Sequence, residues 1–299
     1  MGRASRSKRD GTRQQKIAAQ RAAARRAEIR NRLLMVGGAV VVVVAVVVAF
    51  VLVKTNSKAT TSSGASNGPT GAALSRVVSD VTSVPAPTLD KVGAGSVTRA
   101  PSKVSGPPLT SGGKPEMLYI GAEYCPYCAA ERWAMIVALS RFGTFSGLST
   151  VHSGNNAGEV YPNTPTFTFY KSSYTSKYLA FTPVEETTNI PQGNSYKLLQ
   201  QPTSAQQALL TKYDSQGSIP FIDIGNRYVE VGNLPGYGPQ NIQHMSWSQI
   251  AAALKDPSSP VAKAVDGEAN YLTAGICKAT GNKPSSACTP TVKALESKL

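Results

Sequence analysis

Histidine and cysteine are scarce in this sequence, which has two histidines and four cysteines among 299 residues. A structural zinc site usually takes its four ligands from two close pairs of cysteine or histidine. Two residues separate Cys125 from Cys128, but ten separate Cys277 from Cys288. Only two side chains could replace a cysteine as ligand, those of His152 and His244. The sequence therefore predicts neither a metal site nor a bound cofactor.

Acidic residues are also few, at 17 against 31 lysines and arginines, which gives the chain a net charge of +14. Much of the excess is local, because residues 1–32 carry eleven basic residues against Asp10 and Glu28. This tail has no aromatic residue that could stack on a base, a contact on which single-strand binding often depends. We therefore do not expect nucleic acid as a partner.

An uncharged run follows the basic tail directly. Residues 33–53, LLMVGGAVVVVVAVVVAFVLV, would rise roughly 30 Å as a helix, the thickness of bilayer hydrocarbon. A cleaved signal peptide is the alternative, but its apolar region is usually only about 7–15 residues long. Basic flanks stay in the cytoplasm. We therefore expect one transmembrane helix in the plasma membrane, with residues 1–32 in the cytoplasm against anionic lipid.

The rest of the chain should then lie outside the cytoplasm, in two parts. Residues 54–73 are rich in Ser, Thr, Gly and Asn and have no apolar period, which predicts a flexible linker. Residues 74–299 are predicted to form one folded domain, opening with a short amphipathic helix that ends before Pro85.

The folded domain alternates strand and helix signals. A β-rich run, MLYIGA at 117–122, precedes a helix over 126–142 that should end at a left-handed Gly143. Gly225-Asn226 predicts a hairpin with a two-residue turn and Gly at its first position. This order favours an α/β fold, a mixed sheet covered by helices with a helical C-terminal part. The remaining predicted strands are 166–170 and 177–184, and the remaining predicted helices are 204–213, capped by Ser204, 247–254, capped by Ser246, and 260–276.

Two cysteines two residues apart stand at the start of the helix over 126–142. Pro126 suits the first helical position, which makes Cys125 the N-cap. A sulfur there faces unpaired N–H groups and the positive end of the helix dipole, which stabilise thiolate. Cys125 is thus the candidate nucleophile, and Cys128, one turn later, the candidate resolving thiol. Cys125 should then be partly exposed, and Cys128, inside the first turn, more shielded. The alternative is a purely structural disulfide, although so short a loop adds little entropic stability.

Other side chains near the cysteines have open roles. Glu123 could accept or relay the proton of Cys128, or could be a solvated charge at the strand end. Glu131 and Arg132, with opposite charges, are expected on the exposed face of the helix. Trp133 is expected in the core, where the sequence WAMIVALSRF is nearly all apolar.

Cys277 and Cys288 bracket a loop, KATGNKPSSA, that can turn back on itself. An even number of cysteines outside the cytoplasm favours disulfides. We expect a structural disulfide here, and a second redox pair that relays electrons to Cys125 and Cys128 is the alternative.

Strand, Cys-Pro-Tyr-Cys and helix, followed later by Ile219-Pro220 before a hairpin, resemble the thioredoxin-like superfamily. The resemblance implies that Pro220 is a cis-proline facing the cysteines, and that Ile219 offers its backbone to the substrate. Tyr127, between the cysteines, is expected to contact the substrate as well. Thr164-Pro165 is the other candidate for the cis-proline.

Four stretches, GAEYCPYCAAERWA, YTSKYLAF, SIPFIDIGNRY and LTAGIC, resemble a membrane-anchored thioredoxin-like family catalogued as domain of unknown function 929. Two features depart from ordinary thioredoxin. The Trp-Cys-Gly-Pro-Cys motif is absent, which leaves the redox potential open, and a long insert precedes Pro220, which suggests a different substrate surface.

The sequence therefore predicts a membrane-anchored thiol–disulfide oxidoreductase that acts on thiols or disulfides of exported proteins, with an unidentified membrane protein as redox partner. It does not rank oxidase, isomerase and reductase activity. One alternative is a non-catalytic thioredoxin-like module that binds an envelope partner, and another is a thiol protein that delivers metal.

Overall fold

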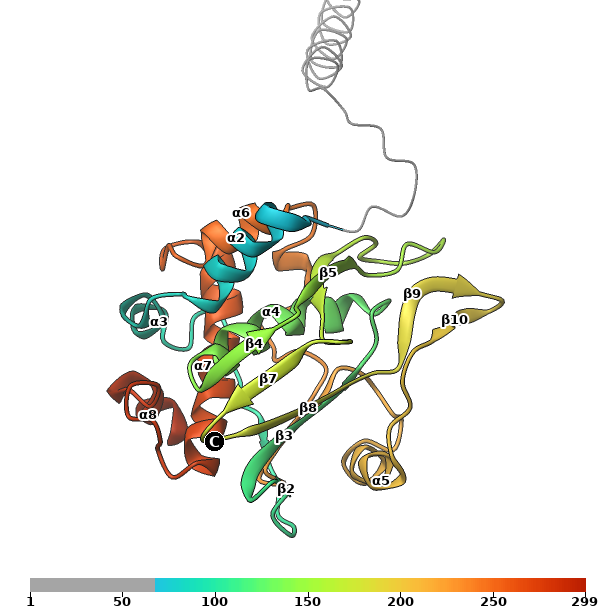
Figure 1. Ribbon diagram of the computed structural model, residues 1–299. Helices are drawn as coiled ribbons and strands as arrows, with labels where there is room; N and C mark the ends of the chain where they lie inside the picture. Colours follow the sequence, from blue (N-terminus) through green and yellow to red (C-terminus); the bar gives the residue numbers. More distant parts are fainter. Residues whose placement is uncertain (1–67) are drawn as a thin grey trace, which may run out of the picture. The chain divides into compact units, whose positions relative to one another are not determined.

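The computed structural model describes residues 68–299, and a six-stranded mixed sheet lies at the centre of this part (Figure 1). Its path is β1-β12-β11-β3-β2, and β8 pairs with β3 on the side of β3 away from β11. The pairing of β3 with β8 is parallel, and the others are antiparallel. The strands are β1 (Ser102–Lys103), β2 (Thr110–Ser111), β3 (Lys114–Gly121), β8 (Ala180–Glu185), β11 (Phe221–Ile224) and β12 (Tyr228–Val231).

Both faces of this sheet are covered by helices. Met117 and Tyr119 of β3 belong to a core shared with α4 (Pro126–Ser140) and α7 (Pro260–Ala279). Leu118 and Ile120, which point the opposite way, pack in a second core with Leu210 of α5. In Figure 1, α5 (Ser204–Tyr213) and α7 lie on opposite sides of β3 and β8. The predicted α/β fold with a mixed sheet covered by helices is confirmed.

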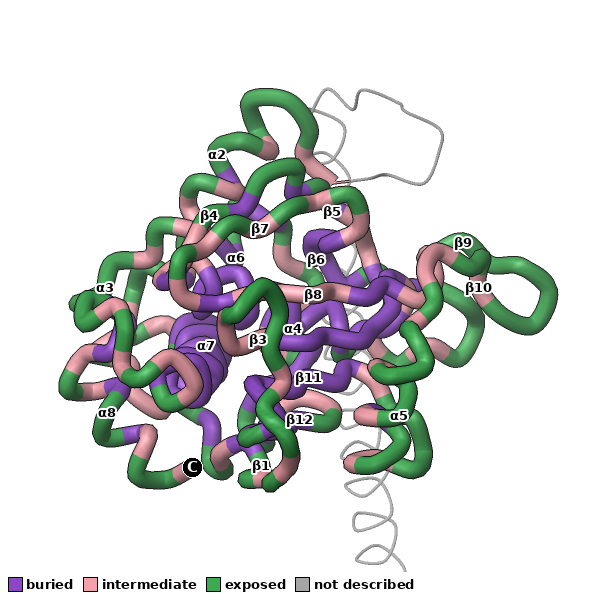
Figure 2. The backbone as a smooth tube through the Cα atoms, turned by 60° about the horizontal axis from the view of Figure 1, so that its bottom comes forward, coloured by how far each residue is buried: buried purple, intermediate pink, exposed green. Residues whose placement is uncertain are grey.

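The long insert between α4 and α5 contributes β8 to the sheet and otherwise forms small antiparallel pairs. In Figure 2 the hairpin of β9 and β10 is largely exposed. These pairs are β4 (Gly143–Ser146) with β7 (Ser173–Ser176), β5 (Ser149–His152) with β6 (Pro165–Thr168), and β9 (Thr187–Gln192) with β10 (Ser195–Leu198).

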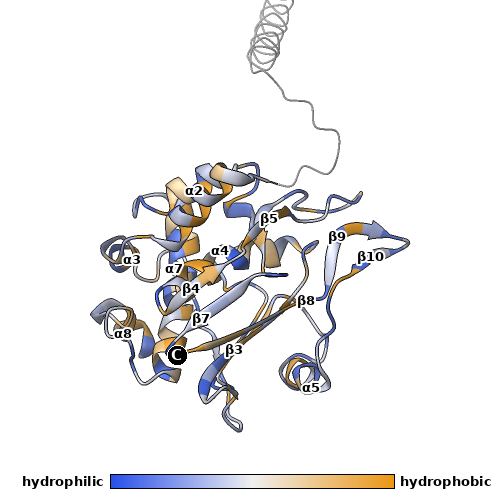
Figure 3. Cartoon of the chain, in the orientation of Figure 1, coloured by the Kyte–Doolittle hydropathy of each residue, from blue (hydrophilic) through white to orange (hydrophobic). Residues whose placement is uncertain are grey.

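Helices also make up the two ends of the described part. Figure 2 shows α7 as largely buried, which fits its position against α4 and the sheet. α2 carries both hydrophobic and hydrophilic residues in Figure 3, and it buries Val77 and Val81, as the predicted amphipathic helix should. These end elements are α2 (Gly71–Thr82), α3 (Ala86–Val92), the short 3-10 helix η1 (Pro239–Asn241), α6 (Trp247–Ala253) and α8 (Pro290–Glu296).

Several element ends differ from the sequence-based expectation, and three of these differences have a local explanation. α2 begins at Gly71, three residues before the expected start of the domain, because Ala72 and Ala73 favour helix. α4 ends at Ser140, and Gly143 instead starts β4, where an added Cβ would lie 2.3 Å from the carbonyl oxygen of Thr175 on the paired strand. Close approach, and not a left-handed conformation, is therefore the reason for glycine here.

The third difference is the cap of α5, which is Thr203 and not Ser204. The hydroxyl of Thr203 accepts from the amide of Gln206, whose side chain accepts from the amide of Thr203. The predicted hairpin is confirmed, with Gly225 and Asn226 both at positive φ between β11 and β12. Its turn has three residues and not two, because Ile224 pairs with Tyr228 and Arg227 completes the turn.

The predicted cytoplasmic tail, transmembrane helix and most of the linker lie outside the described residues. Within residues 68–299, no helix is long and apolar enough to cross a membrane.

Candidate active site

The N-terminus of α4 holds the Cys-Pro-Tyr-Cys motif at the carboxyl end of β3. Cys125 is the N-cap, as predicted, and Pro126 occupies the first turn. The amide of Cys128 donates a hydrogen bond to the Cys125 sulfur over 3.3 Å. The backbone therefore directs an unpaired helix donor at this sulfur, which favours a negative charge on it.

Both cysteines of the motif are free thiols, and both are buried. Cys128 is fully buried, as expected, but Cys125 is only 5% exposed, less than the partial exposure expected of a nucleophile. Its sulfur lies 3.8 Å from the carbonyl oxygen of Ile219, and the ring of the preceding Tyr124 stacks on Tyr196 of β10 at 4.2 Å. Segments distant in sequence thus cover the motif.

The two thiols have shifted pKa values in opposite directions. The neighbouring Cys128 thiol lowers the pKa of Cys125, with smaller contributions from the Cys128 amide and Arg132, although burial opposes them. Burial raises the pKa of Cys128 well above its usual value, and the nearby Cys125 adds to this. Cys125 is therefore the easier thiol to ionise, which suits the first attack in exchange.

Arg132 lies beneath the motif and is completely buried, so its predicted exposure is wrong. Its Nε and Nη2 atoms donate to the two carboxylate oxygens of Glu185 at 2.8 and 2.6 Å, and Nη2 also donates to the carbonyl of Ala122 at 2.8 Å. Glu185 ends β8, the strand parallel to β3, so sheet formation brings it under the helix. The sequence offered no signal for this pairing across 53 residues.

Glu123 follows β3 in a loop and is only 6% exposed, so a solvated strand-end charge is the wrong description. Burial raises the pKa of its carboxyl, while a hydrogen bond with Thr168 opposes the shift. The backbone of Asn189 in the insert also contacts this carboxyl. Both contacts join the Glu123 carboxyl to residues of the insert. Its role as a proton relay to Cys128 stays a prediction.

Ile219 and Pro220 lie where the resemblance implied, immediately before β11 and beside Cys125. Their peptide bond is cis, whereas Thr164-Pro165 is not among the cis bonds of the described residues. Tyr127 is 45% exposed, and its ring meets Tyr161 of the insert edge-on at 6.0 Å. One proposed substrate-contact residue, Tyr127, is thus at the surface, and the other, Ile219, is partly buried.

Trp133 is fully buried and donates from its indole N–H to the carbonyl of Pro165 at 2.9 Å, so its assignment to the core is confirmed. His152, considered above as a replacement zinc ligand, meets the ring of Trp247 edge-on at 4.6 Å. Glu131, also predicted to be exposed, is buried beside the carboxyl groups of Glu230 and Glu268.

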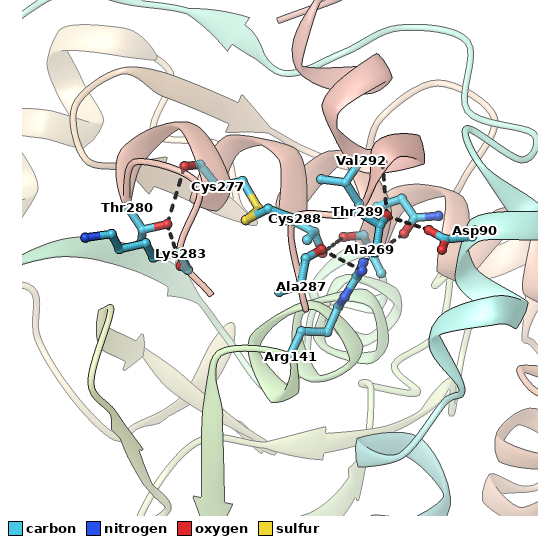
Figure 4. The surroundings of a disulfide bond; sticks show 12 residues. Asp90, Arg141, Ala269, Cys277, Thr280, Lys283, Ala287, Cys288, Thr289 and Val292 are labelled. Carbon is cyan, nitrogen blue, oxygen red and sulfur yellow. Dashed lines mark hydrogen bonds between the residues drawn. A yellow bond between two sulfur atoms is a disulfide. The ribbon is translucent and has the colours of Figure 1, made fainter. Parts of the chain in front are cut away.

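Cys277 and Cys288 form a disulfide that joins the end of α7 to the segment before α8 (Figure 4). Arg141, at the end of α4, donates to the carbonyl of Ala287 beside this bond at 2.7 Å. The hydroxyl of Thr289, the N-cap of α8, donates to Asp90 of α3 at 2.5 Å. These contacts connect the segment that carries Cys288 to α3 and α4, and a structural role for the bond stays a prediction.

The profile of a protein family, described as domain of unknown function DUF929, matches residues 100–278. A comparison with curated proteins and a comparison with solved structures gave no match. The matched range is more than half of the chain, and it contains β3, the cysteine motif, Glu185 and Ile219-Pro220. The chain therefore belongs to the DUF929 family.

Proposed function

We propose that this protein is a thiol–disulfide oxidoreductase with a thioredoxin-like fold, in which Cys125 is the nucleophile and Cys128 the resolving thiol. The observation that carries the proposal is the sulfur of Cys125 at the N-cap of α4, with the amide of Cys128 donating to it over 3.3 Å. The opposite pKa directions of the two thiols support this order of attack.

The strand topology supports the thioredoxin-like part of the proposal. β8, β3, β11 and β12 lie in this order, β3 and β8 are parallel, and β11 and β12 form a hairpin. α4, with the cysteines, follows β3, and α7 packs on the same face of the sheet.

The reaction would proceed in two balanced exchanges. The Cys125 thiolate attacks one sulfur of a substrate disulfide, which forms a mixed disulfide and releases the other substrate sulfur as a thiolate. Cys128 then attacks the Cys125 sulfur and transfers its proton to the departing substrate thiolate. The enzyme ends as a disulfide, and the substrate has gained two electrons. The reverse sequence oxidises a substrate dithiol.

Turnover in either direction needs a second protein dithiol or disulfide that restores the Cys125–Cys128 pair. We propose a redox partner in the membrane for this role, and thiols or disulfides of exported proteins as substrates. Both follow from the proposed topology, in which residues 33–53 span the plasma membrane and the domain lies outside the cytoplasm.

A non-catalytic binding module is the second candidate, and the 5% exposure of Cys125 favours it. A substrate disulfide must reach this sulfur, so the exchange reaction requires the covering segments to move. A binding module would keep the same fold without that movement.

Trapping of mixed disulfides in cells tests the proposal. Cys128→Ser leaves the attacking thiol but removes the resolving thiol, so it should accumulate mixed disulfides with envelope proteins, seen on non-reducing gels after acid quenching. Cys125→Ser should trap few or none, and Cys128→Ser/Cys125→Ser is the matched control. Equal trapping by the two single variants, or none by either, would contradict the assignment and favour the binding module.

A further inference from the structure

Three carboxyl groups from three separate elements meet beneath the cysteine helix. Glu131 belongs to α4, Glu230 to β12 and Glu268 to α7. On β12, Tyr228 and Glu230 share the face that packs against α4 and α7, because side chains alternate along a strand. One carboxylate oxygen of each residue lies within 4.8 Å of one oxygen of both others.

These carboxyls are buried without the partners that such groups normally have. Glu131 and Glu268 are 0% exposed, and Glu230 is 4% exposed. Both oxygens of Glu230, both of Glu268 and one of Glu131 have no hydrogen-bond partner other than the neighbouring carboxyl groups of the cluster. Within residues 68–299 no lysine or arginine forms a salt bridge with them. A buried carboxylate is strongly destabilising unless a proton or a cation neutralises it.

A cavity and a further side-chain oxygen lie close to the cluster. Glu230 and Asn233 line a cavity of about 200 Å³. The side-chain Nδ2 of Asn233 donates to Glu131 at 2.7 Å, while its Oδ1 is buried and unpartnered. Arg99 lines the same cavity but is exposed, so it leaves the buried oxygens without a counter-charge. The cluster thus has a further unpartnered oxygen close to it, and Glu230 is the member of the cluster that lines the cavity.

We propose that Glu131, Glu230 and Glu268 bind one divalent cation of calcium size through their carboxylate oxygens. Calcium takes six to eight oxygen ligands at about 2.3–2.6 Å, several of them protein carboxylates. The three carboxylate oxygens lie within 4.8 Å of one another, close enough to contact one ion. Magnesium keeps several of its waters and usually takes only one or two carboxylates, so a site of three carboxylates favours calcium. Zinc would prefer nitrogen and sulfur ligands.

The cation site is distinct from the proposed redox chemistry but adjoins it. The Nδ2 of Asn233 that donates to Glu131 also donates to the carbonyl of Tyr127, at 3.1 Å, inside the cysteine motif. A bound cation would therefore hold α4, β12 and α7 together directly under that motif.

Calcium binding to the purified full-length chain tests the proposal. After treatment with EDTA and its removal, isothermal titration with CaCl2 should show one ion bound per chain, and CaCl2 should raise the melting temperature. MgCl2 should bind more weakly. No saturable binding of CaCl2 would overturn the proposal, and tighter binding of MgCl2 would overturn the assignment to a calcium-sized ion.

Two isosteric variants locate the site, and a third is the control. Glu230→Gln and Glu268→Gln should each weaken CaCl2 binding by about tenfold or more, because each removes one charged ligand. Glu296→Gln on α8 removes the same charge elsewhere and should leave the affinity unchanged. Wild-type affinity in both cluster variants would place the ion elsewhere and overturn the proposal. The titration of the wild-type chain tests the proposal even if a variant folds poorly.

Discussion

Replacing Arg132 with methionine should destabilise the protein strongly, because it removes one member of a buried ion pair. Arg132 and Glu185 are both 0% exposed and share two hydrogen bonds of 2.6 and 2.8 Å. Removing one partner of such a pair costs about 3–5 kcal/mol, since the other charge is left buried and unpaired. For a domain of about 150–250 residues this corresponds to a melting temperature lower by about 6–20 °C.

The same change should raise the pKa of Cys125. The Arg132 charge is one of the groups that lower this pKa, along with the larger contribution of the Cys128 thiol. Without Arg132, less of Cys125 is thiolate at neutral pH, so its alkylation should be slower there and should need a higher pH. A merely structural role for Arg132 would leave the alkylation profile unchanged.

Chemical denaturation of four proteins measures the coupling between Arg132 and Glu185. They are wild type, Arg132→Met, Glu185→Gln and the double variant. The double variant should lose less free energy of unfolding than the two single variants lose together. Lys255→Met is the control, because it breaks the half-exposed pair of Lys255 with Asp80 and should cost less than about 1 kcal/mol. Losses below about 1 kcal/mol in both single variants at Arg132 and Glu185 would refute the reasoning.

Three further predictions concern the two cysteine pairs and the N-terminal region. In the reduced wild type, alkylation followed over a pH series should modify Cys125 at lower pH than Cys128, because the pKa of Cys125 is lowered and that of Cys128 is raised. Identical pH profiles for the two cysteines would contradict this. Replacing Cys277 and Cys288 with serine should cost about 2–4 kcal/mol in a denaturation experiment and leave the redox potential of the other pair unchanged; a shifted potential would favour the relay. Deleting Met1–Val53 should yield a soluble, folded protein, and recovery in the membrane fraction after sedimentation would contradict the expected anchor.

Local signals predicted the backbone around the motif well. Cys125 is the N-cap of α4 because Pro126 lacks an amide proton and suits the first turn, which depends on neighbours in sequence alone. Gly225 and Asn226 tolerate positive φ, so the hairpin could be located without knowing its partners.

Burial of charge could not be predicted in this way. Glu131 and Arg132 looked like an exposed face because charged side chains are seldom buried without partners. Their partners come from β8, β12 and α7, up to 137 residues further along the chain, and nothing in the local sequence of α4 announces them. The exposure of Cys125 was overestimated for the same reason, since Ile219 approaches its sulfur, and Tyr196 stacks on the preceding Tyr124, only in the folded domain.

Local sequence is sufficient to place one thiol at a helix N-terminus, because capping and proline placement depend on neighbouring residues. It is also sufficient to predict the strands and helices of a mixed α/β domain, since apolar period and turn residues are local too. Which charges are buried together depends on the folded arrangement of distant elements: Arg132 with Glu185, and Glu131 with Glu230 and Glu268. Electrostatic contacts act through space, so the ionisation of Cys125 and the proposed cation site depend on distances that sequence spacing does not contain.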